Sequence, residues 1–80
     1  MSVRILFFGY LVEKTGRSSM HINNHNLVSD SEGLKKFLYS EFPHLEGQIF
    51  KIAINRELIN KKREINDGDE VALMPPYAGG

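Results

Sequence analysis

The residues best suited to chemistry lie at the C-terminal end of the sequence, which closes with Ala78, Gly79 and Gly80. These residues have almost no side-chain bulk, so their backbone could enter a narrow cleft and adopt conformations that are closed to other residues. The terminal carboxylate of Gly80 would then reach the active site of another protein unshielded. Because glycine makes up about 7% of average proteins, a terminal glycine pair is by itself a weak signal.

Two prolines set this tail apart from the rest of the chain. Pro75 and Pro76 fix two φ angles and remove two backbone donors, so a strand that ends at Met74 cannot continue its hydrogen-bond ladder. We therefore expect residues 75–80 to form an extended, flexible tail that leaves the sheet. The composition from Pro75 onward does not suggest packing against the body of the protein.

The other side chains that could do chemistry do not combine into a site. His21, His25 and His44 fall on different predicted segments, and the four-residue spacing of the first two would need a helix to converge on a metal, so we expect no metal site. The chain has no cysteine, which excludes a disulfide, a thiolate nucleophile and a cysteine-held metal or persulfide. Any sulfur chemistry must therefore use another group.

Length and charge narrow the possible partners. Eighty residues are enough for one hydrophobic core, so we expect a single domain over residues 1–80. Ten basic residues balance ten acidic ones, and this balance makes nucleic acid an unfavoured partner. No apolar stretch approaches the roughly 20 residues that span a bilayer. In the absence of a targeting signal, we expect no membrane association and a cytoplasmic location.

The elements that must carry the tail begin with a predicted strand. Residues 3–8 are rich in β-branched and aromatic side chains that alternate between two faces. Residues 10–14 could form a short helical turn that ends at Gly16, where a residue tolerant of positive φ lets the chain reverse. Residues 19–23 alternate again and predict a second strand, paired with the first.

A single long helix is expected next. Ser29 and Glu32 match the capping-box pattern, in which the serine hydroxyl and the glutamate carboxylate satisfy each other's backbone amides, so we expect the helix to begin at Ser29. Pro43 disfavours helical geometry at the residue before it and marks the end. One helical stripe faces the core and consists of Leu34, Phe37, Leu38, Phe42 and Leu45.

Two more strands complete the pattern. Residues 49–54 alternate, with Phe50, Ile52 and Ile54 on one face, and an acidic glycine turn over residues 66–69 leads into residues 70–74. The order strand, strand, helix, strand, strand predicts an α+β fold in which a mixed sheet packs on one long helix, as in the ubiquitin-like β-grasp fold. Strand parity leaves Phe8, Leu58 and Met74 outside the helix-facing set, as an exposed apolar patch of the kind that often marks an interface.

The sequence resembles a known family in three blocks. These are Arg4-Ile5-Leu6-Phe7-Phe8-Gly9, Ala53-Ile54-Asn55, and the specific run from Asp67 to Gly80, DGDEVALMPPYAGG. With these blocks the chain resembles the small subunit of molybdopterin synthase, the MoaD family, within the MoaD/ThiS group of ubiquitin-like sulfur carriers. The resemblance covers essentially the whole chain.

That resemblance implies a carrier and not an enzyme in its own right. An E1-like (MoeB-like) adenylyltransferase would use ATP to join the Gly80 carboxylate to AMP, and a sulfur donor would convert the adenylate to a thiocarboxylate. The tail residues Pro75, Pro76, Ala78 and Gly79 would thread Gly80 into the large (MoaE-like) synthase subunit. There the sulfur would pass to a pterin precursor of the molybdenum cofactor, with no cofactor bound by this chain.

The resemblance also implies that Phe8, Leu58 and Met74 contact the large subunit, in a heterotetramer of two small and two large subunits. Three other functions stay open. The same chemistry could serve thiamine or another sulfur acceptor, although Pro75-Pro76 favours the molybdopterin branch. A ubiquitin-like modifier joined through Gly80 to lysines of target proteins is a second alternative, and a passive protein-binding domain is a third.

Overall fold

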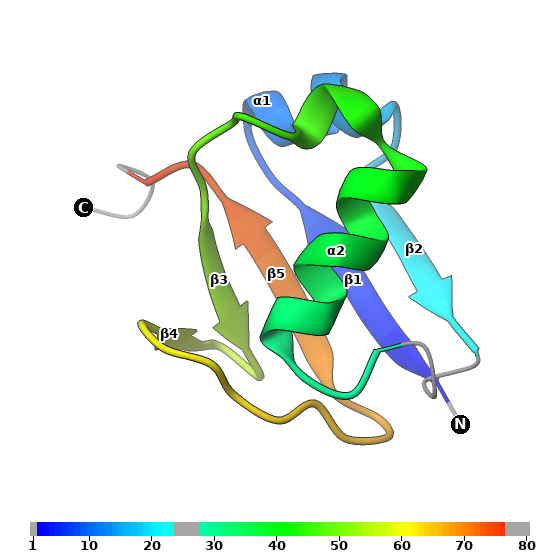
Figure 1. Cartoon of the computed structure of the whole chain (residues 1–80), viewed down its shortest axis with the longest axis vertical. Helices are drawn as coiled ribbons and strands as arrows, with labels where there is room; N and C mark the ends of the chain where they lie inside the picture. The colour runs from blue at the N-terminus through cyan, green and yellow to red at the C-terminus, as the bar shows by residue number, and fades with distance from the viewer. Residues whose placement is uncertain (1, 24–27, 77–80) are drawn as a thin grey trace.

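A computed structural model describes residues 2–23 and 28–76 of the chain. Its core element is a five-stranded sheet with the strand order β2-β1-β5-β3-β4 (Figure 1). Strands β1 and β5, which are far apart in the sequence, run parallel to each other in the middle of the sheet, and every other neighbouring pair is antiparallel. The strands are β1 (Val3–Phe7), β2 (Ser19–Ile22), β3 (Lys51–Ile54), β4 (Glu57–Ile59) and β5 (Glu70–Met74).

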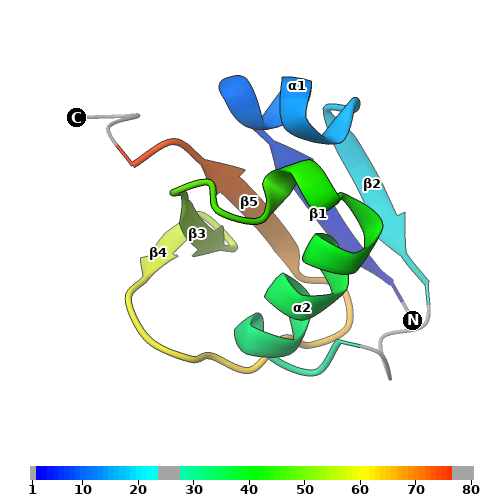
Figure 2. The ribbon, with the colours of Figure 1, turned by 45° about the horizontal axis from the view of Figure 1, so that its top comes forward.

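One long helix, α2 (Ser31–Glu41), lies across one face of this sheet (Figures 1 and 2). Two shorter helices, α1 (Tyr10–Thr15) and η2 (Pro43–Leu45), lie at the end where β1 and β5 finish. The expected α+β, ubiquitin-like β-grasp architecture with a mixed sheet is thereby confirmed. None of the described helices is long and apolar enough to pass through a lipid bilayer.

The core forms where the alternating strand residues meet the helix. Ile5 and Phe7 of β1 and Val71 and Leu73 of β5 are buried on the face that α2 covers, because successive strand residues point to opposite sides. The Phe7 and Phe42 rings meet edge to face, with centroids 5.8 Å apart. The helical stripe packs as expected, through Leu34, Leu38 and Leu45, which are buried, and Phe37 and Phe42, which are partly buried.

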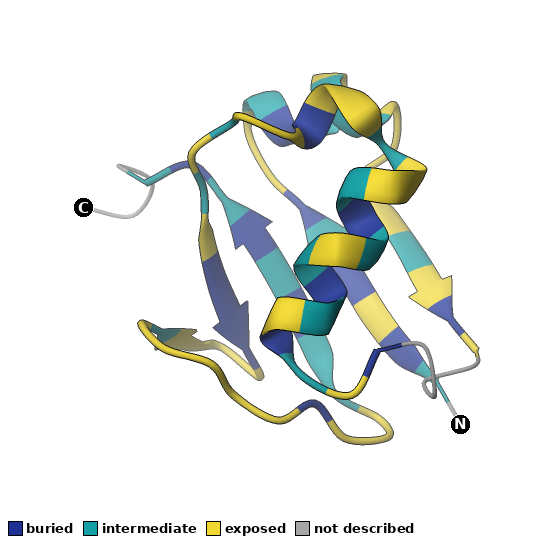
Figure 3. Ribbon diagram, viewed as in Figure 1, coloured by how far each residue is buried: buried dark blue, intermediate teal, exposed yellow. Residues whose placement is uncertain are grey.

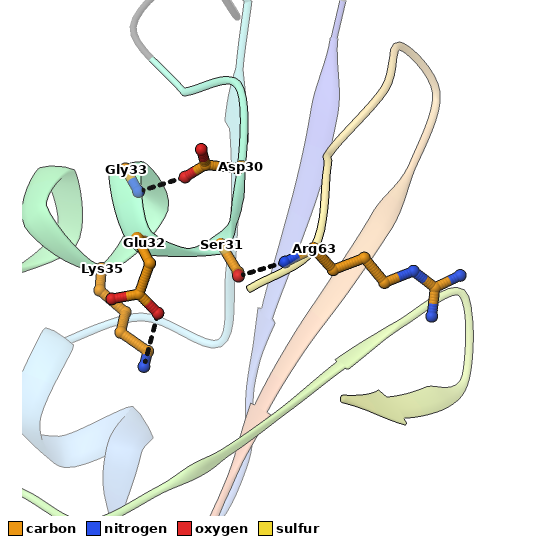
Figure 4. Close-up of polar contacts among 6 residues, drawn as sticks. All are labelled: Asp30, Ser31, Glu32, Gly33, Lys35 and Arg63. Atoms are coloured by element: carbon orange, nitrogen blue, oxygen red, sulfur yellow. Dashed lines mark hydrogen bonds and ion pairs between the residues drawn. The ribbon is translucent and has the colours of Figure 1, made fainter. Parts of the chain in front are cut away.

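The start of α2 differs from the sequence prediction. Asp30, and not Ser29, is the N-cap residue, and its Oδ1 accepts a hydrogen bond of 2.8 Å from the Gly33 amide (Figure 4). Asp and Ser are comparable caps, so local sequence does not decide between them. Pairing across the fold does: the Ser29 carbonyl accepts from the Ile65 amide, while the buried Ser31 hydroxyl accepts from the Arg63 amide at 3.0 Å.

One strand boundary was wrong, and one short strand was missed. The third strand begins at Lys51 and not at Ile49, whose side chain is 71% exposed and whose carbonyl accepts a hydrogen bond from the Tyr10 hydroxyl. Strand β4 was not anticipated as a strand, because three residues are too few to show a period. The short helix α1 was expected, and it ends as predicted at Gly16, which has φ 77°.

Candidate functional site

The face of the sheet opposite α2 carries an apolar groove of about 570 Å³. Its floor follows one row across four strands, since β1 Leu6 lies opposite β5 Ala72, Ala72 lies opposite β3 Ala53, and Ala53 lies opposite β4 Leu58. Directly opposed residues point to the same face of a sheet. The two alanines in the middle of the row are small and the residues at its ends are large, and this difference in size hollows the surface.

The structure brings together all three residues that strand parity placed outside the core. Phe8, Leu58 and Met74 line this groove, with Phe8 and Leu58 46% and 57% exposed. In the view of Figure 3 the exposed and half-buried segments of β1 and β5 alternate with buried ones, while β4 has only exposed and half-buried residues. Large side chains this exposed on one surface are typical of a site where another protein docks.

One end of the groove is closed by a tight turn between β3 and β4. Asn55 and Arg56 form this two-residue turn, and both have positive φ angles, 51° and 68°. The Asn55 side chain is fixed at both ends, because its Nδ2 donates to Asp69 Oδ1 at 2.9 Å and its Oδ1 accepts from the Glu70 amide at 3.0 Å. The acidic turn before β5 therefore holds the groove's end in place.

Sequence reasoning missed the polar residues of the groove. Arg56 and Glu70 also line it, at the end away from Met74, and Glu70 Oε2 lies 3.9 Å from Arg4 Nη1. The dipeptide Asn55-Arg56 between two apolar runs was a usable signal, since asparagine at the first position favours a two-residue hairpin turn. Nothing in the sequence pattern shows that this turn stands at the end of an apolar groove.

The tail is described only at its base. Pro76 is half-buried, and Pro75 is buried, which corrects the expectation that residues from Pro75 onward do not pack. Pro75 lies close to Gly9, which has φ 58°. A β-carbon added to Gly9 would be 2.5 Å from Pro75 Cγ. The tail residues Ala78, Gly79 and Gly80 lie outside the described residues, and their proposed role stays a prediction.

No metal-binding cluster is found in residues 2–23 and 28–76, where no three His, Asp or Glu side chains come together. His21 on β2 and His44 in η2 are exposed and belong to separate elements, and His25 lies outside the described residues.

Comparison with known proteins decides which group of proteins this is. The model of the ThiS family matches residues 5–80. The chain belongs to that family. Two curated relatives that match this chain over nearly their full length are named molybdopterin synthase sulfur carrier subunit. The one from Dictyostelium discoideum is 31% identical over 81 residues, which are 96% of this chain and 94% of that protein. The one from Mycobacterium tuberculosis is 31% identical, covering 100% of this chain and 99% of that protein.

Solved structures agree with this placement in the MoaD/ThiS group. A chain in the complex of subunits 1 and 2 of the molybdopterin-converting factor from Helicobacter pylori is 29% identical, with both chains covered completely and a TM-score of 0.71. SAMP1 from Haloferax volcanii matches with a TM-score of 0.78 over all of both chains. Its 22% identity makes it evidence of the shared fold alone.

Proposed function

We propose that this chain is the sulfur carrier subunit of a molybdopterin synthase. The observation that carries the proposal is the position of the apolar groove at the base of the tail. Met74 lines the groove and stands six positions before Gly80. Because six residues span about 20 Å at most, a partner docked on the groove holds the chain terminus within that radius of its own surface. The relatives that share this chain's full length support the pathway.

The chemistry is centred on the Gly80 carboxylate. A carboxylate resists nucleophilic attack because it is negatively charged and has a poor leaving group. In the first step its oxygen attacks the α-phosphorus of ATP, and pyrophosphate leaves. Sulfide (HS⁻) released by a sulfur donor then attacks the carbonyl carbon of the mixed anhydride, AMP leaves with the electrons of the broken C–O bond, and the S–H proton is lost to water. The product is a thiocarboxylate, whose sulfur is a good nucleophile at neutral pH.

The chain supplies sulfur while its partners supply catalysis. An E1-like, MoeB-like enzyme performs the activation, and a MoaE-like large subunit binds the pterin precursor that accepts the sulfur. The Helicobacter pylori complex of subunits 1 and 2, which contains a 29% identical chain, supports the second of these partners. We place the carrier in the cytoplasm, where ATP is available, and we expect two small and two large subunits in the assembled synthase.

Docking uses the groove lined by Phe8, Leu58 and Met74. An apolar side chain of the large subunit that fills the hollow above Ala53 and Ala72 would remove Phe8 and Leu58 from water. Burying exposed apolar area contributes roughly 25 cal/mol per Å² before the costs of association are subtracted. The small floor residues matter here, because larger side chains at those positions would fill the groove from within.

Intact mass spectrometry of the protein isolated from its own cells tests the proposal. A sulfur carrier should include a form in which one oxygen of the terminal carboxylate is replaced by sulfur. A protein modifier would instead be found joined through Gly80 to lysines of larger proteins, and a passive binding domain would show neither form. If the thiocarboxylate sulfur is found to pass to a thiamine precursor and not to a pterin, the chain is a sulfur carrier for thiamine and the molybdopterin assignment is wrong.

A further inference from the structure

Arg56 adopts a backbone conformation that disfavours its own side chain. Asn55 and Arg56 connect Ile54 to its cross-strand partner Glu57, and positive φ at both turn residues defines a type I′ turn. Asparagine suits the first position of this turn and glycine the second, because a β-carbon crowds the backbone in the left-handed region. An arginine in the second position therefore works against the stability of the hairpin.

Contacts within the fold do not explain why an arginine stands there. Arg56 is exposed. In the part of the chain that the structure describes, the ion pairs join Glu32 to Lys35, Glu57 to Arg63 and Glu70 to Arg4, and Arg56 belongs to none of them. The carboxylates of Glu57 and Glu70 are thus paired with other arginines. Backbone strain that the fold does not need is a reason to look for a function at the strained residue.

The position of Arg56 indicates what that function is. Arg56 lines the apolar groove at the end where the β3–β4 turn lies, which is the end away from Met74. Among the described residues that line the groove, the other charged one is Glu70, which lies beside Arg4. A protein bound in the groove would therefore contact an apolar floor and, at its edge, the positive charge of Arg56, which no ion pair among the described residues neutralises.

We propose that Arg56 determines partner specificity by pairing with a carboxylate of the large synthase subunit when that subunit occupies the groove. The inference rests on the proposed function. Arginine suits this task because its planar guanidinium can bind both oxygens of a carboxylate, and it loses less hydration on burial than a lysine ammonium does. A charge at the edge of an interface accelerates association and rejects partners of the same sign, and both effects weaken with salt.

The test measures folding and binding on the same set of variants. Arg56→Gly creates the favoured Asn-Gly turn, so its Tm should rise by about 4–8 °C. Its affinity for the large synthase subunit of the same organism should nevertheless fall about 3-fold to 10-fold at low ionic strength, mainly through slower association. At about 0.5 M salt this difference from the wild type should largely disappear.

Two further variants isolate the charge. Arg56→Lys keeps both the charge and the strained backbone, so it should retain most of the affinity and the original Tm. Lys36→Gln removes one positive charge from the exposed side of α2, on the far side of the sheet from the groove, and should bind like the wild type. Opposite changes in stability and in affinity for Arg56→Gly are a combination that a purely structural residue would not produce.

Three results would overturn the inference. The first is an Arg56→Gly variant that binds as well as the wild type at low salt, and the second is a loss of affinity that is equal at low and high salt. The third is an Arg56→Gly Tm that does not rise, since the strain would then be absent. If instead the wild-type chain does not bind the large subunit at all, the proposed function itself fails, so the two failures are distinguishable.

Discussion

Asn55 and Asp69 join the two turns at one end of the sheet, through a 2.9 Å hydrogen bond from Asn55 Nδ2 to Asp69 Oδ1. The second oxygen of Asp69 accepts from the Asn66 amide at 2.8 Å, so one carboxylate shapes its own turn and also holds the β3–β4 turn. The acidic glycine turn is therefore structural at Asp69. Its effect on the groove is indirect, because it positions the Asn55-Arg56 turn.

Replacing Asn55 with alanine should destabilise the protein by about 2 kcal/mol. Two side-chain hydrogen bonds are lost, each worth about 1 kcal/mol, and alanine tolerates positive φ less well than asparagine does. Urea unfolding at equilibrium measures the change. Asn60→Ala, at an exposed position just beyond β4, is the matched control and should stay within about 0.5 kcal/mol of the wild type. Equal unfolding midpoints for the two variants would contradict the role assigned to Asn55.

Asp30→Ala and Ser29→Ala should separate the two possible caps of α2. Removal of Asp30 leaves the Gly33 amide without its partner, at a cost of about 0.5–2 kcal/mol. Ser29 contributes its backbone carbonyl to the Ile65 amide, and alanine keeps that carbonyl, so Ser29→Ala should be nearly neutral. Thermal unfolding followed by circular dichroism compares them. A larger loss at Ser29 than at Asp30 would restore the capping box predicted from the sequence.

Phe8→Asp should weaken binding to the large synthase subunit at least 10-fold, which corresponds to about 1.4 kcal/mol. The folded state should change little, because Phe8 is already 46% exposed. Calorimetric titration measures the affinity. Ile49→Asp removes an even more exposed apolar side chain that does not line the groove, so its affinity should match that of the wild type. Comparable losses for both variants would show that the groove has no special role.

Deleting Gly80 should abolish thiocarboxylate formation and leave the fold intact. The remaining terminus would still be a glycine carboxylate, but it would stop one residue short, by about 3.5 Å, of where the activating enzyme holds it. Mass spectrometry after incubation with the activating enzyme, ATP and a sulfur donor measures the product. The urea midpoint should equal that of the wild type. Thiocarboxylate formed at an undiminished rate on the shortened chain would refute the assignment of Gly80.

Much of the architecture follows from local pattern. The two-residue alternation through Ile5 and Phe7, and again through Val71 and Leu73, states which side of each strand is buried, because the period of a strand is a backbone property. In the same way, the helical spacing of Leu34 and Leu38 predicts which face of α2 is buried. By the same parity Phe8 and Met74 had to lie away from the core, so those two residues of the groove could be predicted from the sequence.

Tertiary structure decided the rest, because it depends on which segments pair. Leu58 was predicted to lie outside the core, but its place beside Ala53 in the groove follows from the pairing of β4 with β3. The hollow exists because Ala53 and Ala72 come side by side from segments far apart in the sequence. The cap of α2 lies at Asp30 and not Ser29 because the loop before β5 pairs with this segment. Sequence sets the face of each residue, but only cross-strand register determines its neighbours.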